Sequence, residues 1–253
     1  MPARVIADPG NTNQRGITQE AADWDDAHAA DGSSAILGGD SGGNRVTIAR
    51  DAGSAYFIGR GVIGYDFRNA GLPGHIRVVR AHLHIGGTSA RDDATNGDKL
   101  RVGVITNPTI STDISIRKTD YALLRYDSNS YTSAQTVADG VTARGAVVQL
   151  DNANLLKHLT SAINNRGLLH LGLRNELDVL DDASGVTGIN RVWFSPPGLQ
   201  GGSFHISTRV RLNIFYRVIS NLKNTGGRDA GGIASAGFCT GNTFGGTNSG
   251  FGS

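Results

Sequence analysis

The feature that most constrains the fold is the stretch from Arg60 to Gly87, in which two apolar runs flank a turn. The runs 60–67 and 76–85 are rich in β-branched and aromatic residues, and asparagine, glycine and proline lie between them. We therefore expect a β-hairpin here. An isolated two-stranded ribbon is marginally stable in water, so other strands must supply a second layer that buries its apolar face.

Alternation along the second run predicts which of its side chains face the core. The inward face is expected to carry Val79, Ala81, Leu83 and Ile85, and the outward face Arg80, His82 and His84. A slip of one residue would exchange the two faces, so the pattern specifies the register strongly. We expect residues 46–219 to form one cooperative core with the hairpin at its centre.

The same stretch carries a family resemblance. Arg60 opens the first run, Phe67 closes it, a Leu-Pro-Gly turn follows, and the return run contains Ile76, Ala81, Leu83 and Ile85. This order resembles the DNRLRE-type, carbohydrate-binding-module-like jelly rolls of phage structural proteins and some surface proteins, over roughly residues 1–218. The motif consists of packing and turn residues, so the resemblance implies a jelly-roll fold more than an activity.

Composition supports a single β-domain followed by an arm. The chain of 253 residues contains 36 glycines, which suits many short strands and tight turns. No interior stretch resembles a linker, so we expect an all-β jelly-roll sandwich over residues 1–220 and a glycine-rich arm over 221–253. The formal charge of +2, with 24 basic and 22 acidic residues, provides no electrostatic footprint for nucleic acid.

The single cysteine, Cys239, excludes an intrachain disulfide and a zinc site built from several cysteines. Residues 1–8 contain too short an apolar run for a signal peptide, and no stretch approaches the length of a membrane span. We expect a protein that is made in the host cytoplasm and incorporated into a virion, without a membrane partner.

Several further elements are expected from periodicity and capping. Apolar residues at helical spacing predict one clear helix from Asn154 to Asn165, with Asp151 or Asn152 as its cap and Gly167 beyond its end. Thr18 could cap a second short helix over residues 18–24. Further strands are expected at 46–49, 55–58, 99–106, 145–150, 168–173, 192–195 and 208–219. Residues 109–137 fit short strands or long loops equally, and we expect a surface lined by Tyr121, Tyr126 and Tyr131.

Two groups of side chains have the chemistry of metal ligands. His82 and His84 lie two residues apart on one expected strand face, but the common metals need a third or fourth ligand, and none is identifiable by spacing. Asp92, Asp93 and Asp98 flank an Asn-Gly turn and resemble an oxygen-rich calcium loop without the EF-hand pattern. Half-buried histidines and a solvated turn are the favoured interpretations, so no metal and no cofactor is expected. The glycine pairs of 38–43 lack the strand-to-helix context of a phosphate loop.

Catalytic interpretations are weaker than structural ones. Carboxylates for glycoside hydrolysis could come from Glu176, Asp178, Asp181 and Asp182, but the sequence does not define their separation and a polar loop explains them as well. Cys239 has no histidine neighbour in the sequence and lies in the arm, where catalysis would lack preorganised groups. Trp24 and Trp193 are expected to be partly buried, with a sugar-stacking platform as the alternative.

The arm from Lys223 to Ser253 contains ten glycines and no periodic apolar pattern. Its conformational entropy exceeds what its few aromatic residues can offset, so it cannot fold alone. Phe238, Phe244 and Phe251 are spaced as anchors that could bury their rings on a neighbouring subunit. The alternative is a disordered, solubilising tail.

These observations favour a non-enzymatic structural protein of a phage virion, such as a capsid decoration, neck, tail or fibre component. Its expected partners are other virion subunits, including copies of itself in a homo-oligomer. The alternative from another class is a glycan-binding adhesin module that recognises a cell-surface glycan, and a third is a polysaccharide-degrading enzyme. A glycan array distinguishes the first two.

Overall fold

A computed structural model describes residues 2–7, 14–37, 44–50, 55–73, 75–85, 89–91, 99–105, 116–124, 131–136, 140–141, 146–186, 188–195 and 210–219. The chain divides into two compact units, Met1–Arg217 and Val218–Ser253. The anchors proposed from the sequence, Phe238, Phe244 and Phe251, lie outside the described residues, as do Cys239 and the aspartates of 92–98.

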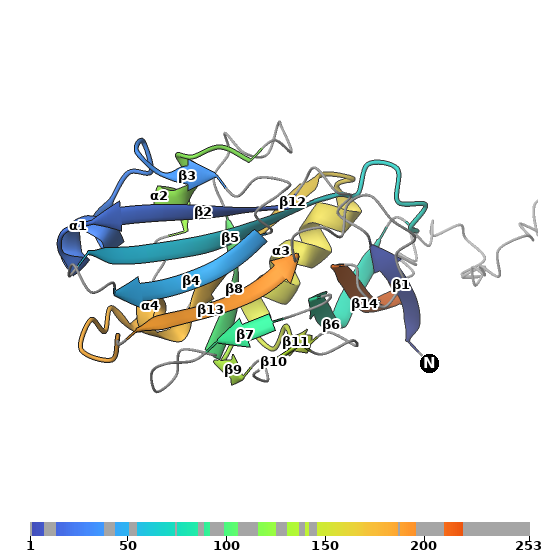
Figure 1. Cartoon of the computed structure of the whole chain (residues 1–253). Helices are drawn as coiled ribbons and strands as arrows, with labels where there is room; N and C mark the ends of the chain where they lie inside the picture. The colour runs from blue at the N-terminus through green and yellow to red at the C-terminus, as the bar shows by residue number, and fades with distance from the viewer. Residues whose placement is uncertain are drawn as a thin grey trace, which may run out of the picture. The chain divides into compact units, whose positions relative to one another are not determined.

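The first unit is built from two antiparallel sheets (Figure 1). The four-stranded sheet, called the small sheet below, contains β1 (Ala3–Ala7), β14 (Arg211–Val218), β6 (Ile76–Ile85) and β11 (Ala146–Gln149), in that order. The ten-stranded sheet, called the large sheet, contains β10 (Gly140–Val141), β7 (Ser89–Arg91), β13 (Ile189–Ser195), β4 (Asn44–Arg50), β5 (Tyr56–Asp66), β12 (Leu168–Asn175), β8 (Lys99–Ile105) and β9 (Gln135–Thr136), in that order. Strand β2 (Gln14–Ala21) also pairs with β5, and β3 (Ile36–Leu37) pairs with β2. The expected all-β sandwich is confirmed.

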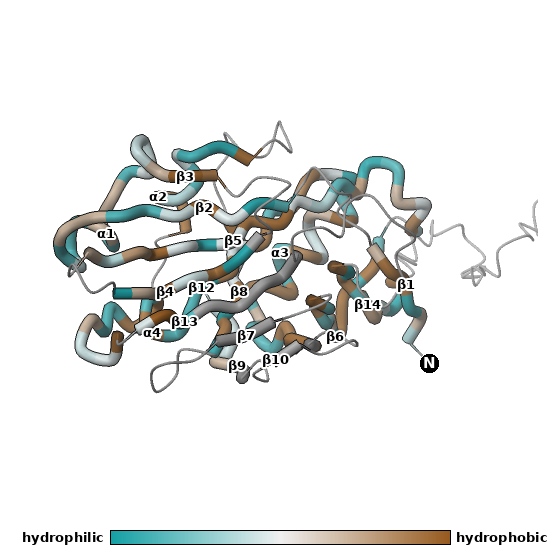
Figure 2. The backbone as a smooth tube through the Cα atoms, viewed as in Figure 1, coloured by the Kyte–Doolittle hydropathy of each residue, from teal (hydrophilic) through white to brown (hydrophobic). Residues whose placement is uncertain are grey.

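The main core lies between the facing sides of the two sheets. The large sheet contributes apolar side chains from β5, β8 and β12, and the small sheet contributes them from β6, β11 and β14. The strands expected at 99–106 and 208–219 are present, and their alternate residues are buried in this core: Leu100, Val102, Val104, Val210, Leu212, Ile214 and Tyr216. In Figure 2 the brown, apolar positions concentrate where α3 (Ala153–Asn164), β6 and β14 meet the large sheet.

The predicted hairpin is wrong in one respect that changes the topology. Its two runs are strands, but β5 belongs to the large sheet and β6 to the small sheet, so they do not pair with each other. The connection of nine residues is longer than a tight hairpin turn and carries positive φ angles at Gly71 and His75. It therefore carries the chain from one layer to the other. In addition, the expected strands 55–58 and 60–67 are one strand, β5.

The phase of β6 also differs from strict alternation. Val78 and Ala81 are buried, whereas Val79 and Arg80 between them are exposed, Val79 by 38%. The local reason is a change of neighbour along the strand edge. The N-terminal end of β6 is bonded by α3, where Asn164 accepts from the Ile76 N–H at 2.8 Å and Thr160 accepts from the Val78 N–H at 3.1 Å. Beyond the irregularity the edge pairs with β11 instead.

The helix predicted over 154–165 is confirmed as α3, with Asn152 as its N-cap. Within the described ranges three shorter helices accompany it: α1 (Trp24–Ala29), α2 (Asp120–Leu123) and α4 (Glu176–Leu180). The helix expected over 18–24 is wrong, because this segment is mostly strand β2, whose backbone pairs with β5. The helix begins later, where the Asp23 carboxylate accepts from the Asp26 N–H at 2.8 Å.

The short helices cover the other side of the large sheet and enclose a second core. Its buried members come from β2, α1, β4, β5, α2 and α4, and include Ile17, Trp24, Ile58, Val62, Tyr121 and Leu177. Residues before 46 therefore contribute to the buried interior, which corrects the expected limits of the core. Residues 58–65 of β5 are buried on both sides of the sheet, so every polar side chain among them needs a partner inside the protein.

Candidate functional site

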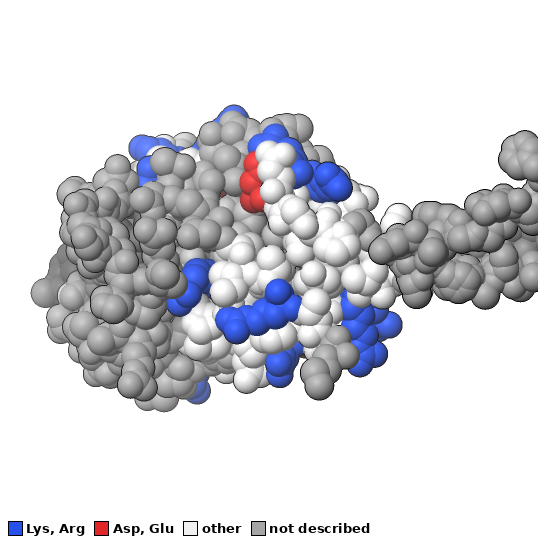
Figure 3. Space-filling view, turned by 90° about the vertical axis from the view of Figure 1, so that its right-hand side faces the viewer, with Lys and Arg blue, Asp and Glu red and all other residues white. Residues whose placement is uncertain are grey.

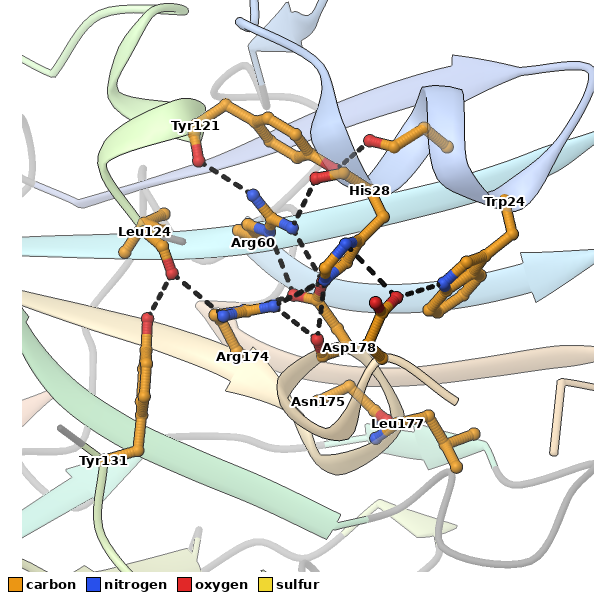
Figure 4. Close-up of polar contacts among 12 residues, drawn as sticks. Trp24, His28, Arg60, Tyr121, Leu124, Tyr131, Arg174, Asn175, Leu177 and Asp178 are labelled. Carbon is orange, nitrogen blue, oxygen red and sulfur yellow. Dashed lines mark hydrogen bonds and ion pairs between the residues drawn. The ribbon is translucent and has the colours of Figure 1, made fainter. Parts of the chain in front are cut away.

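Several charged side chains come together in this second core (Figure 4). Arg60 from β5, Arg174 from the end of β12 and Asp178 from α4 are each no more than 2% exposed. We call these three residues the buried charge cluster. Around it lie His28 from α1, Tyr121 from α2 and Tyr131, so the cluster joins segments that are far apart in the chain.

The local sequence Arg174-Asn175-Glu176-Leu177-Asp178 explains how the carboxylate reaches its place. Asn175 ends β12 and caps α4, because its side-chain oxygen accepts from the Leu177 N–H at 2.9 Å. One helical turn then places Asp178 four residues after Arg174, back over the guanidinium. The strand end and the helix start thus form one half of the cluster without any long-range contact.

Both guanidiniums bind the same carboxylate in bidentate geometry. Arg60 donates from Nε to Oδ2 of Asp178 at 2.9 Å and from Nη2 to Oδ1 at 2.8 Å. Arg174 donates from Nε to Oδ2 at 2.6 Å and from Nη2 to Oδ1 at 2.8 Å. The carboxylate therefore accepts four charge-assisted hydrogen bonds, which is the strongest class available to a side chain in a protein interior.

The cluster contains two positive charges and one negative charge, so further acceptors must compensate the second arginine. Backbone carbonyls supply them: Arg60 donates to Tyr121 O at 3.0 Å and to His28 O at 3.1 Å, and Arg174 donates to Leu124 O at 3.1 Å. Aromatic faces add to this. The Tyr121 ring lies 4.0 Å from the Arg60 guanidinium carbon, and the Tyr131 ring lies 5.5 Å from that of Arg174.

The electrostatic field of the cluster is visible in its pKa values. Burial alone would raise the pKa of Asp178, but the two arginines and their hydrogen bonds outweigh it and hold the pKa well below its ordinary range. Burial lowers the pKa of Arg174, yet Asp178 more than reverses this and raises it. Burial raises the pKa of Tyr131 to about 12. All three groups thus keep one protonation state at neutral pH and are unsuited to proton transfer there.

The direction of the Asp178 shift also defines where the carboxylate stabilises the fold. An unfolded aspartate has a pKa of about 3.9, and the folded-state value lies below it. The contribution of this group to the free energy of unfolding is therefore complete above that pH. It is lost only as the pH falls through the lower folded-state value.

His28 links the cluster to the surface. Burial lowers the pKa of His28, and the nearby arginines lower it further. Together these effects outweigh the carboxylates of Asp178 and Asp181, which raise the pKa, so the ring is neutral at pH 7. Both ring nitrogens have polar neighbours: Nδ1 lies 3.3 Å from the Asp181 carboxylate, and Nε2 lies 3.0 Å from the Asp178 carbonyl oxygen and 3.2 Å from Arg174 Nη2. Trp24 stacks on the ring and donates to Asp181 at 2.6 Å.

The four carboxylates considered for glycoside hydrolysis have separate partners. Asp178 is bound in the cluster, Glu176 pairs with Arg101, Asp181 is the left-handed cap of α4, and Asp182 accepts from Ser184. Glu176 and Asp178 are buried, and each carboxylate is bound by arginine. The pKa of Asp178 is held below its ordinary range by its two arginines, so this carboxyl does not provide the protonated acid that the reaction requires.

The other candidate residues are placed as follows. His82 and His84 share the outer face of β6 as expected, and the part of the chain that the structure describes contains no group of three potential ligands for a metal. Trp24 is 6% exposed, so its ring is no sugar platform; β13 contains Trp193, whose side chain is outside the description. The expected tyrosine surface is wrong for Tyr121 and Tyr131, which are buried against the arginines, and Tyr126 lies outside the described residues.

Sequence reasoning missed Arg60 and Arg174 as partners of Asp178, although a signal was present. Arg60 lies in an otherwise uncharged run from Tyr56 to Tyr65, and Arg174 follows the apolar run of β12. A charge inside a run buried on both faces must be paired within the protein. The spacing of four residues between Arg174 and Asp178 then identifies one partner, whereas the pairing of Arg60 with Asp178 depends on tertiary contacts alone.

One close approach holds α2 in the position that brings Tyr121 to the cluster. Gly32 has φ of +84°, and a Cβ there would lie 2.2 Å from the Lys118 carbonyl oxygen and 2.9 Å from Tyr121 Cβ. Gly71 also has a positive φ, +63°, but a Cβ there would meet nothing within 4 Å. Both glycines therefore have a left-handed backbone, but only at Gly32 would a side chain collide with neighbouring atoms.

We expect Gly71→Ala to lower the free energy of unfolding by about 1 kcal/mol, the usual penalty of a left-handed non-glycine residue. Gly32→Ala should cost at least about 2 kcal/mol more, because the backbone of 118 must move as well. Urea denaturation of both variants measures the difference. Equal losses would show that the loop carrying α2 yields freely, and that the close approach does not position Tyr121.

Among the helices that the structure describes, none is both long enough and apolar enough to cross a membrane. A scan of the chain against protein-family models found no match, and a search of curated proteins likewise found none. The resemblance to DNRLRE-type jelly rolls therefore stays a prediction. The geometry supports a narrower conclusion, namely that the buried charge cluster is a structural site that fastens α1, α2 and α4 to the large sheet.

Proposed function

We propose that this protein is a non-enzymatic structural subunit of a phage virion, which works by contacts with other subunits. The observation that carries the proposal is the buried charge cluster. Its charged side chains are enclosed and bound to each other, and the pKa of Asp178 lies well below its ordinary range, which suits a rigid building block and leaves these groups unavailable to a substrate. The resemblance of the Arg60–Gly87 stretch to phage jelly rolls supports the assignment to a virion.

The alternative of a glycan-binding module receives less support from the described residues. Such a module uses exposed aromatic rings as stacking platforms. Trp24, Tyr121 and Tyr131 are buried, and their rings already contact His28, Arg60 and Arg174. A capsid decoration, neck, tail or fibre component is compatible with the same fold.

The glycine-rich arm is the proposed means of assembly. Burying one phenylalanine side chain stabilises a contact by about 1.5 to 3 kcal/mol, so the three rings of Phe238, Phe244 and Phe251 can offset much of the entropy lost when the arm is ordered. Repetition of the contact in a symmetric particle adds avidity. The arm would then lie along a neighbour in the manner of strand addition.

The test compares the full chain with a truncation after Ser220. We expect the truncated protein to keep its thermal unfolding transition and to lose its incorporation into particles, measured in the lysate of the producing cells. A matched variant with Phe238, Phe244 and Phe251 changed to serine keeps the length of the arm and should fail in the same way. Unchanged incorporation of both would make the arm dispensable, and absence of the full chain from particles would overturn the structural role.

A further inference from the structure

Basic and acidic side chains of the first unit lie in different regions, and the small sheet is a region with basic side chains only. Its four strands contain no aspartate, glutamate or lysine, yet they contain Arg4, Arg77, Arg80, Arg211 and Arg217. In the view onto the side of the unit where β1, β14 and β6 lie, blue side chains are spread among uncharged ones, and red carboxylates appear at one place only (Figure 3). We call the outward-facing residues Arg4, Arg80, His82, His84, Arg211 and Phe215 the basic face.

Contacts within the basic face hold its arginines in place. Arg4 lies opposite Phe215 in the pairing of β1 with β14, and its guanidinium carbon is 5.9 Å from the ring centroid. The Arg80 guanidinium carbon lies 4.4 Å from the same centroid, and the His82 ring centroid lies 5.6 Å from it. Arg4 also donates to Asn213 at 2.9 Å. The guanidiniums are thus positioned in advance, which reduces the entropy that binding would cost.

The composition of this face suits a protein partner. Interfaces between proteins are enriched in arginine and depleted in lysine, aspartate and glutamate, as these four strands are, and Phe215 adds an aromatic ring among the arginines. The apolar side chains of Ile6 and Val147, 47% and 48% exposed, lie on the same strands. A nucleic-acid surface would instead be expected to belong to a strongly basic chain, and the net charge here is only +2.

The chain itself contains a complementary surface. From Gly16 to Asn44 there is no lysine or arginine, and α1 with its flanks exposes Glu20, Asp23, Asp25, Asp26 and Asp31. We call these five residues the acidic end. Figure 1 shows α1 at one end of the large sheet and β1, β14 and β6 on the opposite side of the unit. Arg50 lies beside this end, since its guanidinium carbon is 5.1 Å from the Tyr56 ring centroid and the Tyr56 ring packs against Trp24 of α1.

We propose that the basic face binds the acidic end of a second copy of this chain, in a head-to-tail contact. The inference rests on the proposed structural function, of which it specifies one subunit contact. Since the two surfaces are different and lie on opposite sides of the unit, the same molecule cannot satisfy itself. Repetition then leads to a ring if the rotation closes and to a filament if it does not. A net charge near zero means that copies do not repel each other as wholes.

The test is an exchange of charge between two variants of the full chain. Arg4→Glu with Arg80→Glu reverses the basic face, and Asp25→Lys with Asp26→Lys reverses the acidic end. Sedimentation velocity at about 50 mM and about 500 mM salt measures self-association, because exposed charges are screened within about 10 Å at 0.1 M salt. We expect the wild-type chain to associate at low salt, and each variant alone to associate at least tenfold more weakly.

Mixing the two variants is the decisive step. The reversed face of one then meets the reversed end of the other, and the two unaltered surfaces also match, so association should return. Association can return only if both variants are folded. The variant with Asp25→Lys and Asp26→Lys changes α1 alone, so it tests the contact even if the substitutions in β1 and β6 affect folding. Lys157→Glu with Arg166→Glu, which changes the net charge equally outside both surfaces, should associate like the wild type.

Three outcomes would overturn the contact. They are a wild-type chain that is monomeric at both salt concentrations, variants that associate unchanged, and a mixture that does not recover. A monomeric chain that retains a labelled DNA duplex through Arg4 and Arg80 would assign the basic face to nucleic acid instead. A chain that enters particles but never self-associates in solution would sink this contact and leave the proposed structural function intact.

Discussion

Asp178→Asn is expected to lower the free energy of unfolding by about 3 to 5 kcal/mol, or to prevent accumulation of folded protein. The substitution keeps the size of the side chain and removes its charge, so Arg60 and Arg174 are left as two buried cations without a counter-ion. A native domain is stable by about 5 to 15 kcal/mol, so this loss is a large fraction of the total. Chemical denaturation in urea measures it.

Asp66→Asn provides the matched control. Asp66 also pairs with an arginine, since Arg68 Nη2 lies 2.5 Å from its carboxylate, but both side chains are partly exposed, at 32% and 55%. An exposed pair contributes about 0 to 1 kcal/mol, so this variant should unfold almost like the wild type. Comparable losses in the two variants would mean that burial does not distinguish the pairs, and that the cluster does not hold α4 against the sheet.

The size of this effect does not imply that the cluster was the most stable solution for the interior. Desolvating three charged groups is costly, and apolar residues of similar volume often stabilise a core equally well. The cluster instead fixes the orientation of the helices that pack around it. Bidentate pairing and the carbonyls of Tyr121, Leu124 and His28 accept only one arrangement of α1, α2 and α4, whereas apolar contacts tolerate several. A subunit that presents a defined surface to its neighbours benefits from this single arrangement of its helices.

The parts of the fold that could be predicted are those determined by local periodicity. The alternation of β8 and β14 and the amphipathic pattern of α3 each describe one element facing one core, so the sequence identifies the buried side chains directly. The sequence pattern predicts two strands in place of β5, because Gly59 separates the apolar runs 55–58 and 60–67. In the structure Gly59 lies between β2 and β4, where a Cβ would meet Thr18 and Thr47 at 3.1 Å.

The parts that could not be predicted depend on contacts between distant segments. A strand, a turn and a strand fit a hairpin and a crossing between two sheets equally well, because both bury the same residues. The pairing of β5 with β2, β4 and β12, and of β6 with β14 and β11, is decided by segments on either side of the stretch. For the same reason Arg60 looked like the start of a strand, although it is the centre of the buried cluster.

Leu83→Asp is expected to abolish soluble expression, and the irregular phase of β6 gives this prediction a sharp control. Leu83 is fully buried in the main core, where a carboxylate would lose its hydration without gaining a partner, at a cost of several kcal/mol beyond the lost apolar contacts. Val79, which strict alternation places on the same face, is 38% exposed. Val79→Asp should therefore cost only about 1 kcal/mol, the range of strand preference at an exposed position.

The soluble fraction after expression and the thermal unfolding of whatever is recovered measure both variants. Loss of both proteins would show that β6 alternates without a break and that Val79 faces the core after all. A Leu83→Asp variant with wild-type thermal stability would exclude β6 from the core altogether, and with it the packing of the small sheet on the large one. Survival of Val79→Asp beside loss of Leu83→Asp is the only result consistent with a strand that pairs first with α3 and then with β11.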